Sequence, residues 1–196
     1  LEFRRVLFRS MLASVPGLKV VSPSNPYDAK GLLKSAIRDD DPVIFMESEM
    51  MYSDLGEVPE EDYLIPIGKC NVAHEGRDVT IVSYNKMMKI ALKAAEILES
   101  ENISAEVIDL RTIRPLDIET IIASVKKTNR LIIVDESWPF TSVASEIVFQ
   151  VQRYAFDFLD APVRRVCGAD SSMHYAPNLV DAYLPSVEKV VETVKA

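Results

Sequence analysis

The sequence predicts an α/β protein: a three-layer α/β/α sandwich with a mostly parallel five-stranded sheet, preceded by a smaller βαβ unit. First, short apolar runs alternate with longer amphipathic stretches, as in folds where helices connect parallel strands. Second, residues 131–134 are apolar and rich in β-branched side chains, which is typical of a strand buried on both faces. Third, 196 residues that are 48% apolar and 27% charged can bury a core without a metal or a disulfide.

The chain divides into four parts by composition. Residues 1–10, LEFRRVLFRS, carry three arginines and a single acid, Glu2, and we interpret them as a cloning or adapter artefact rather than a transit peptide. Residues 11–50 predict a βαβ unit, which is too small to be a domain and is expected to be the carboxyl-terminal remnant of one. Residues 51–63 are acidic and aperiodic, so they predict an exposed linker. Residues 64–196 hold the main domain.

The individual elements follow from periodicity and from residues that begin helices. Pro26 marks a helix start, because the missing N–H of proline costs nothing there, and Asp117 is a typical N-cap. A further strand at 69–74 is expected at an edge of the sheet. The other predicted strands lie at 18–21, 42–47, 79–83, 106–110, 131–134 and 163–167, and the helices at 26–38, 85–99, 117–125, 142–154 and 185–195.

Charge and cysteine content argue against several classes of function. Acidic residues outnumber basic ones by 30 to 22, for a net charge of −8, so nucleic acid and anionic membranes are poor partners and a basic protein surface is a plausible one. No apolar run approaches the roughly 20 residues of a membrane span. Cys70 and Cys167 belong to no Cys/His cluster, so we expect neither a disulfide nor a zinc site, and a reducing compartment.

Signatures of common enzyme classes are absent from the sequence. The turn after the strand at 79–83 lacks G-x-G-x-x-G, and neither a P-loop nor a G-x-S-x-G elbow occurs, which argues against a dinucleotide cofactor and against a serine hydrolase. His74 and His174 are the only histidines. We interpret His74 as a solvent-exposed loop residue rather than a catalytic group.

Charged residues gather where three predicted strands end, which is where open α/β sheets hold their sites. The clusters are residues 109–117, 135–139 and 168–177. We favour loop bracing or subunit contact over catalysis. Arg111 and Arg114 would pair with nearby acids, and the only tryptophan would pack beneath them. The candidate acids are Asp117, Asp135 and Glu136.

Five motifs in a specific order carry a resemblance. They are PGLKVVSP at 16–23, KSAIRD at 34–39, LRTIRPLD at 110–117, FLDAPV at 158–163 and GAD at 168–170. Together they resemble the β-subunit family of the thiamine-diphosphate-dependent decarboxylase component of the pyruvate dehydrogenase complex, within the wider transketolase-like family. The resemblance implies an amino-terminally truncated chain, with the end of a pyrimidine-binding domain up to residue 50. It also implies that residues 64–196 are a transketolase carboxyl-terminal domain, whose first strand runs antiparallel to the other four.

The resemblance also implies a function for a complete αβ enzyme, the oxidative decarboxylation of pyruvate with acetyl transfer to a lipoyl acyltransferase. Thiamine diphosphate and Mg²⁺ would serve that enzyme. The family's catalytic glutamate and histidine would lie upstream of this chain, and its Gly-Asp-Gly magnesium signature is absent here. We therefore assign no catalytic and no cofactor-binding residue, and expect the fragment alone to be inactive.

Partners and location follow from the same resemblance. The partners would be an α subunit in an α2β2 heterotetramer, a second β subunit, and the peripheral-subunit-binding domain of the dihydrolipoyl acyltransferase. The location would be the bacterial cytoplasm, or the mitochondrial matrix in a eukaryote. Two alternatives stay open: the β subunit of a branched-chain 2-oxo acid or acetoin dehydrogenase, and a stand-alone non-catalytic interaction module.

Two sites can be carried over onto this sequence. The family's potassium ion, held by main-chain carbonyls, would lie at Ala36, Ile37, Asp39 and Asp41, where a helix end leaves carbonyls unsatisfied. The alternative is a helix end bonded to water alone. Asp160 would contribute to acyltransferase docking through charge complementarity, or it would merely cap the turn that follows it.

Overall fold

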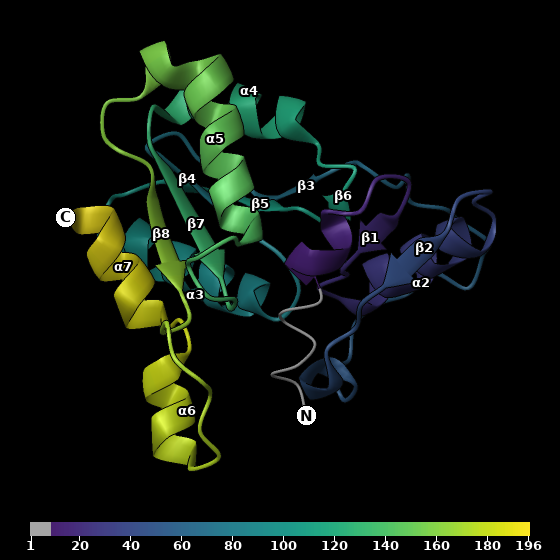
Figure 1. Ribbon diagram of the computed structural model, residues 1–196. Coiled ribbons are helices and arrows are strands. Elements are labelled where there is room, and N and C mark those ends of the chain that lie inside the picture. The colour runs from purple at the N-terminus through teal and green to yellow at the C-terminus, as the bar shows by residue number, and fades with distance from the viewer. Residues whose placement is uncertain (1–8) are drawn as a thin grey trace.

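Two β-sheets organise the protein, whose structure is a computed structural model that describes residues 9–196 (Figure 1). The larger sheet contains β3 (Asn71–His74), β4 (Val79–Ser83), β5 (Ala105–Asp109), β7 (Leu131–Asp135) and β8 (Arg164–Cys167). Its spatial order is β3-β5-β4-β7-β8. The smaller sheet contains β1 (Lys19–Val21), β2 (Val43–Phe45) and β6 (Thr112–Arg114), in the order β2-β1-β6.

The larger sheet confirms the predicted fold class. The strands β4, β5, β7 and β8 run parallel to their neighbours, whereas β3 pairs antiparallel with β5 at the edge. The strand expected at residues 69–74 is therefore present, and its antiparallel direction is the one implied by the family resemblance.

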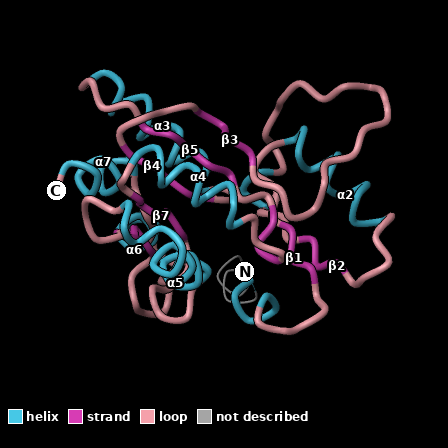
Figure 2. Tube along the Cα trace, turned by 90° about the horizontal axis from the view of Figure 1, so that it is seen from above, coloured by secondary structure: helices cyan, strands magenta, loops and turns pink. Residues whose placement is uncertain are grey.

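Helices cover both faces of the larger sheet and make it the middle of three layers (Figures 1 and 2). The helices α3 (Met87–Ser100) and α7 (Val187–Lys195) contact each other on one face, and α4 (Ile118–Thr128) and α5 (Val143–Ala155) contact each other on the opposite face. Within β4, Ile81 packs into the core beneath α3 and α7, whereas its neighbour Val82 packs into the core beneath α4 and α5. Burial on both faces explains why apolar residues stand next to each other in β4 and why β7 begins with four of them.

Helix starts follow the capping rules that the sequence predicts. The Asp117 carboxylate accepts a hydrogen bond from the Thr120 N–H at 3.4 Å, and the Ser142 hydroxyl accepts one from the Ser145 N–H at 3.3 Å. Each satisfies a backbone donor that the first turn of a helix leaves free. The predicted starts of α4 and α5 are thereby confirmed to within a residue.

The smaller sheet joins the two parts of the chain in a way that the sequence did not predict. Residues 112–114 were expected in a turn but form β6, which pairs antiparallel with β1. The chain reverses before this strand at Arg111, whose φ is +56°. Because of this pairing, Val20 and Ile113 lie in one hydrophobic cluster with the core of the larger sheet. The βαβ unit thus packs directly on the main domain.

The acidic segment at 51–63 is mostly exposed and lies against the helix α2 (Pro26–Ile37). The rings of Tyr63 and Tyr27 stack with their centroids 4.6 Å apart. Nearer its start, Asp54 forms an ion pair of 2.6 Å with Lys89 of α3. The 3-10 turn η1 (Glu49–Met51) leads into the segment. Side-chain contacts therefore hold it to both parts of the molecule.

The sequence did not predict one short helix near the carboxyl terminus. The short helix α6 (Pro177–Tyr183) projects away from the sheet in Figure 1, and Tyr183 is its one fully buried residue. With so little apolar surface facing the core, it has no helical periodicity to detect. The 3-10 turn η2 (Phe156–Phe158) extends α5. Within residues 9–196, no helix combines the length and apolar character that a membrane span needs.

Candidate functional site

The carboxyl ends of the parallel strands are packed with buried polar side chains that pair with one another. The ammonium of Lys86, after β4, lies 2.6 Å from the Glu136 carboxylate after β7, and both side chains are less than a tenth exposed. Beside them the Tyr84 hydroxyl donates to Asp135 at 2.7 Å. Burial, followed by the nearby charge of Asp135, raises the pKa of Tyr84 well above its usual value. Arg9 also contacts Glu136, so internal pairs occupy the place where open α/β sheets hold ligands.

A second polar network connects the smaller sheet and α2 to the main domain. The Arg111 guanidinium donates through Nε and Nη2 to both oxygens of Asp28, at 2.9 and 2.6 Å. Asp28 is completely buried at the start of α2, and the Asn25 side-chain amide also donates to it at 2.8 Å. This bidentate pair bridges residues that are 83 positions apart, so it is specific to the folded chain.

Asp109 lies behind this pair and is almost fully buried at the end of β5. It accepts hydrogen bonds from the Arg111 N–H at 3.0 Å and from the Ser24 hydroxyl. Burial raises the pKa of Asp109 to about 6, and repulsion from Asp28 acts in the same direction, while the hydrogen bonds and Arg111 oppose it. Arg111 thus bonds two buried carboxylates, Asp28 through its guanidinium and Asp109 through its main-chain N–H.

The expected partners of the two arginines are wrong, although their bracing role holds. Arg111 pairs with Asp28, and Arg114 donates to the main-chain oxygen of Ala13, so neither bonds Asp117, Asp135 or Glu136. The acids have other roles: Asp117 caps α4, and the other two pair within the strand-end cluster. Asp28 was missed because it gives no local signal beyond being an acid in the first turn of a helix.

The remaining strand-end residues also differ from expectation. The Trp138 indole N–H donates to the main-chain oxygen of Ser171 at 2.8 Å and so connects two loops, rather than packing beneath the arginines. His74 is not an exposed loop residue: it ends β3, is half-buried, and its Nδ1 lies 2.8 Å from the main-chain oxygen of Ala105. His174 is exposed in the loop before α6.

The candidate potassium residues lie where α2 ends and the chain turns toward β2. The Ala36 carbonyl accepts a long hydrogen bond, 3.4 Å, from the Asp39 N–H. The side chains of Asp39 and Asp41 both contact the Lys19 ammonium, at 2.7 and 3.0 Å. The hydrogen bond from Lys19 lowers the pKa of Asp39. Lys19 therefore balances the carboxylates, while Ile37 is three-quarters exposed beside them.

Asp160 is exposed on the loop before β8, where its own N–H donates to the Asn129 main-chain oxygen at 2.9 Å. It lines a hollow of about 330 Å³ near the end of α7. Arg130 and Arg164 line the same hollow, as does Lys195, which pairs with Glu101. The net charge of the chain had led us to expect an acidic surface around Asp160. The surface there is instead mixed in charge.

Both cysteines are free and poorly suited to nucleophilic chemistry. Burial raises the pKa of Cys167 to about 12 and that of Cys70 further still. Since the thiolate is the nucleophile, both side chains stay neutral and unreactive near pH 7.

The chain matches two protein families. The family "Transketolase, C-terminal domain" matches residues 68–190, and the family "Transketolase, pyrimidine binding domain" matches residues 6–54.

Curated relatives match almost the whole chain. It is 50% identical over 192 residues to the mitochondrial pyruvate dehydrogenase E1 component subunit beta of Dictyostelium discoideum. The matched stretch covers 96% of this chain and 54% of the relative. It is also 50% identical over 190 residues to the pyruvate dehydrogenase E1 component subunit beta of Rhizobium meliloti (strain 1021). Here the matched stretch covers 96% of this chain and 41% of the relative. The chain therefore spans about half the length of the curated relatives it matches.

A solved structure shows the same fold. A split-gene transketolase, described as an inactive beta4 tetramer, superposes with a TM-score of 0.82 at 25% identity, covering 97% of this chain and 60% of that one. With the carboxyl-terminal family spanning more than half of the sequence, and with a solved transketolase sharing its arrangement of strands and helices, the chain belongs to the transketolase C-terminal domain family.

Proposed function

We propose that this chain is the carboxyl-terminal part of the β subunit of a pyruvate dehydrogenase, an enzyme that decarboxylates pyruvate oxidatively and passes the acetyl group to a lipoyl acyltransferase. The observation that carries the proposal is the continuous identity of about 50% with such β subunits across 96% of the chain. The identity extends through both sheets rather than being confined to one motif. The wider family uses thiamine diphosphate, so the complete enzyme would depend on it.

The role proposed for these residues is assembly and docking rather than chemistry. Within residues 9–196, no three His, Cys, Asp or Glu side chains are grouped so that they could hold a metal ion. At the strand ends Lys86 already pairs with Glu136, and the Tyr84 hydroxyl already donates to Asp135. We assign no residue of this chain to Mg²⁺ or to thiamine diphosphate, and we derive no chemical step through these groups.

The proposed partners are an α subunit, in an α2β2 heterotetramer, and a second β subunit. The relatives carry the name of an E1 component subunit, and the similar transketolase is described as a tetramer. The relatives include both mitochondrial and bacterial proteins. We accordingly propose the bacterial cytoplasm, or the mitochondrial matrix in a eukaryote.

An assay of the complete αβ enzyme tests the proposed reaction. The rate at which an artificial electron acceptor is reduced is measured with pyruvate, branched-chain 2-oxo acids or acetoin as the substrate. We expect the largest kcat/KM for pyruvate. A preference for a branched-chain acid or for acetoin would assign the β subunit to one of those dehydrogenases. An αβ complex inactive with all of them would favour a non-catalytic interaction module.

The end of α2 is proposed to hold a potassium ion through the main-chain carbonyls of Ala36, Ile37, Asp39 and Asp41. A bound ion stabilises the folded state by about 2.7 kcal/mol at a concentration 100 times its dissociation constant. We therefore expect a higher thermal unfolding midpoint in KCl than in NaCl of equal ionic strength. Rubidium, an ion of similar size, should replace potassium. Equal midpoints in all three salts would contradict the site.

Asp160 is proposed to contact the acyltransferase's peripheral-subunit-binding domain. Charge at the rim of an interface changes the association rate, and salt screens this effect. We expect Asp160→Ala, in the complete αβ enzyme, to slow association with the isolated domain several-fold at low salt and to have little effect at high salt. Glu119→Ala, at an exposed position on α4, is the matched control. An unchanged rate for Asp160→Ala at low salt would remove this residue from the interface.

A further inference from the structure

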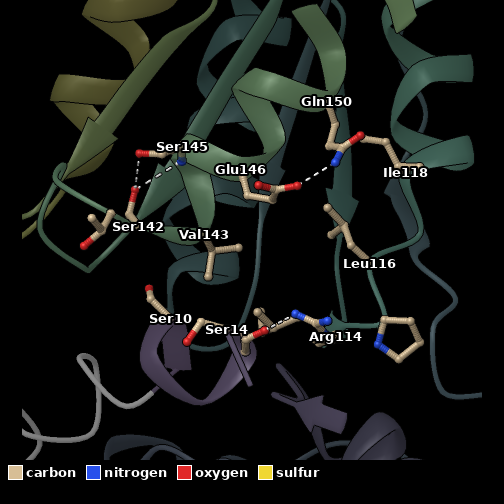
Figure 3. A pocket seen from close by; sticks show the side chains of 14 residues that line it. Ser10, Ser14, Arg114, Leu116, Ile118, Ser142, Val143, Ser145, Glu146 and Gln150 are labelled. Carbon is tan, nitrogen blue, oxygen red and sulfur yellow. Dashed lines mark hydrogen bonds between the residues drawn. The ribbon is translucent and has the colours of Figure 1, made fainter. Parts of the chain in front are cut away.

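A pocket of about 630 Å³ opens between α5, the loop that leads into α4, and residues 10–14 (Figure 3). Small-molecule sites typically measure about 300–1,000 Å³. It lies outside the buried ion pairs described above, and none of the proposed potassium or docking residues lines it. The functions proposed so far therefore leave this pocket without a role.

The pocket combines apolar walls with one guanidinium. Leu116, Ile118 and Val143 supply the apolar surface, and Figure 3 shows their side chains arranged around the opening. Arg114 lines the same space and donates from Nη1 to the main-chain oxygen of Ala13. Among residues 9–196, Arg114 has no carboxylate partner. A half-buried guanidinium beside apolar side chains is suited to a ligand with a carboxylate at one end and an apolar body.

The facing wall carries a negative charge. Glu146, in the first turn of α5, accepts a hydrogen bond of 2.5 Å from the Gln150 side-chain amide. In the described part of the chain it has no basic partner, and Figure 3 shows it on the α5 side of the pocket, away from Arg114. A carboxylate in this position repels a second anionic group on a ligand whose first carboxylate reaches Arg114.

We propose that this pocket binds an organic monocarboxylate, with its carboxylate on Arg114 and its apolar body against Leu116, Ile118 and Val143. Glu146 sets the specificity by disfavouring dicarboxylates. The proposal does not depend on the reaction of the complete enzyme, because it concerns binding to side chains of this chain alone.

Calorimetric titration of the full chain with hexanoate, hexanamide and adipate tests the proposal. Hexanamide lacks the charge of hexanoate, and adipate adds a second carboxylate. We expect hexanoate to bind saturably and at least tenfold more tightly than either of the other two. Arg114→Gln should weaken hexanoate binding at least tenfold, and Glu146→Gln should strengthen adipate binding while leaving that of hexanoate almost unchanged. Arg130→Gln, an exposed arginine outside the pocket, is the matched control.

A second variant separates binding from folding, since Arg114 also bonds Ala13. Leu116→Trp fills the pocket without altering any charge and should weaken hexanoate binding to a similar extent. Three results would each overturn the proposal: no saturable binding of hexanoate, equal binding of hexanoate and hexanamide, or unchanged hexanoate affinity in a folded Arg114→Gln protein. If adipate fails to gain affinity in Glu146→Gln, the specificity assigned to Glu146 is wrong.

Discussion

Replacing Arg111 with methionine is expected to lower the free energy of unfolding by about 3–5 kcal/mol, the cost of removing one partner from a buried ion pair. Methionine keeps most of the apolar stem but removes the guanidinium that bonds both oxygens of Asp28. Asp28 is fully buried, and without Arg111 no cation within residues 9–196 would pair with its carboxylate in this medium of low dielectric. Asp109, which is nearly as buried, would lose a nearby positive charge.

Urea unfolding followed by circular dichroism measures this effect, with Arg38→Met as the matched control. Arg38 is half exposed and contacts Asp62 at 3.3 Å on the surface, so its loss should cost no more than about 1 kcal/mol. Combining Arg111→Met with Asp28→Asn removes the unpaired charge and should recover part of the lost stability. Equal effects of the two single arginine variants would show that the buried pair contributes no more than a surface one.

Asp109→Asn is expected to abolish a pH-dependent loss of stability of about 3 kcal/mol. Burial raises the pKa of Asp109 from 3.8 to about 6, a shift of about two units at ~1.36 kcal/mol per unit. Between pH 4 and 6 the folded state therefore binds the proton that the unfolded state has released. Asp109 therefore stabilises the folded state fully when the pH is below its pKa in the unfolded chain. This stabilisation is lost as the pH rises through its pKa in the folded protein. Asparagine stays neutral throughout and should not show this loss.

The measurement compares the free energy of unfolding of wild type and Asp109→Asn from pH 4.5 to 8. Relative to the wild type, the variant should gain stability as the pH rises toward 6.5 and then stay constant. Asp62→Asn provides the contrast, because the hydrogen bond from Lys34 lowers the pKa of Asp62. The Asp62 carboxylate stabilises the folded state above its pKa in the unfolded chain, and this effect is lost only in more acidic solution. The difference in the free energy of unfolding between wild type and Asp62→Asn should therefore not change with pH above pH 5. Parallel curves for wild type and Asp109→Asn would exclude Asp109 as the titrating group.

Together these predictions locate the sensitive point of the molecule where the βαβ unit meets the main domain. Arg111 stands at the chain reversal between β5 and β6, and Asp109 ends β5 directly before it. One buried ion pair and one shared sheet therefore join the two parts of the chain at this point. Variants there should alter assembly into a larger complex as well as stability, since the relative position of the two parts depends on them.

The sequence by itself determined the elements whose cause is local. The alternation of apolar runs predicted the strands of the larger sheet, and Asp117 predicted the start of α4, because burial of a strand and capping of a helix depend on residues that are neighbours in the chain. The ordered motifs at 110–117 and 158–163 indicated the family for a similar reason, since they are continuous stretches of sequence. Direct reading of the residues thus sufficed for fold class and family.

Only the tertiary structure decided which distant residues meet. The pairing of β6 with β1, the bond from Arg111 to Asp28, and the meeting of Arg114 and Glu146 at one pocket all join parts of the chain that are far apart in sequence. The sequence does not specify which acid an arginine pairs with, because several acids are equally compatible with it. For the same reason, a short β-branched run does not specify which strand it pairs with. The packing of the whole chain selects one of them, by bringing together the groups whose burial would be costly without a partner.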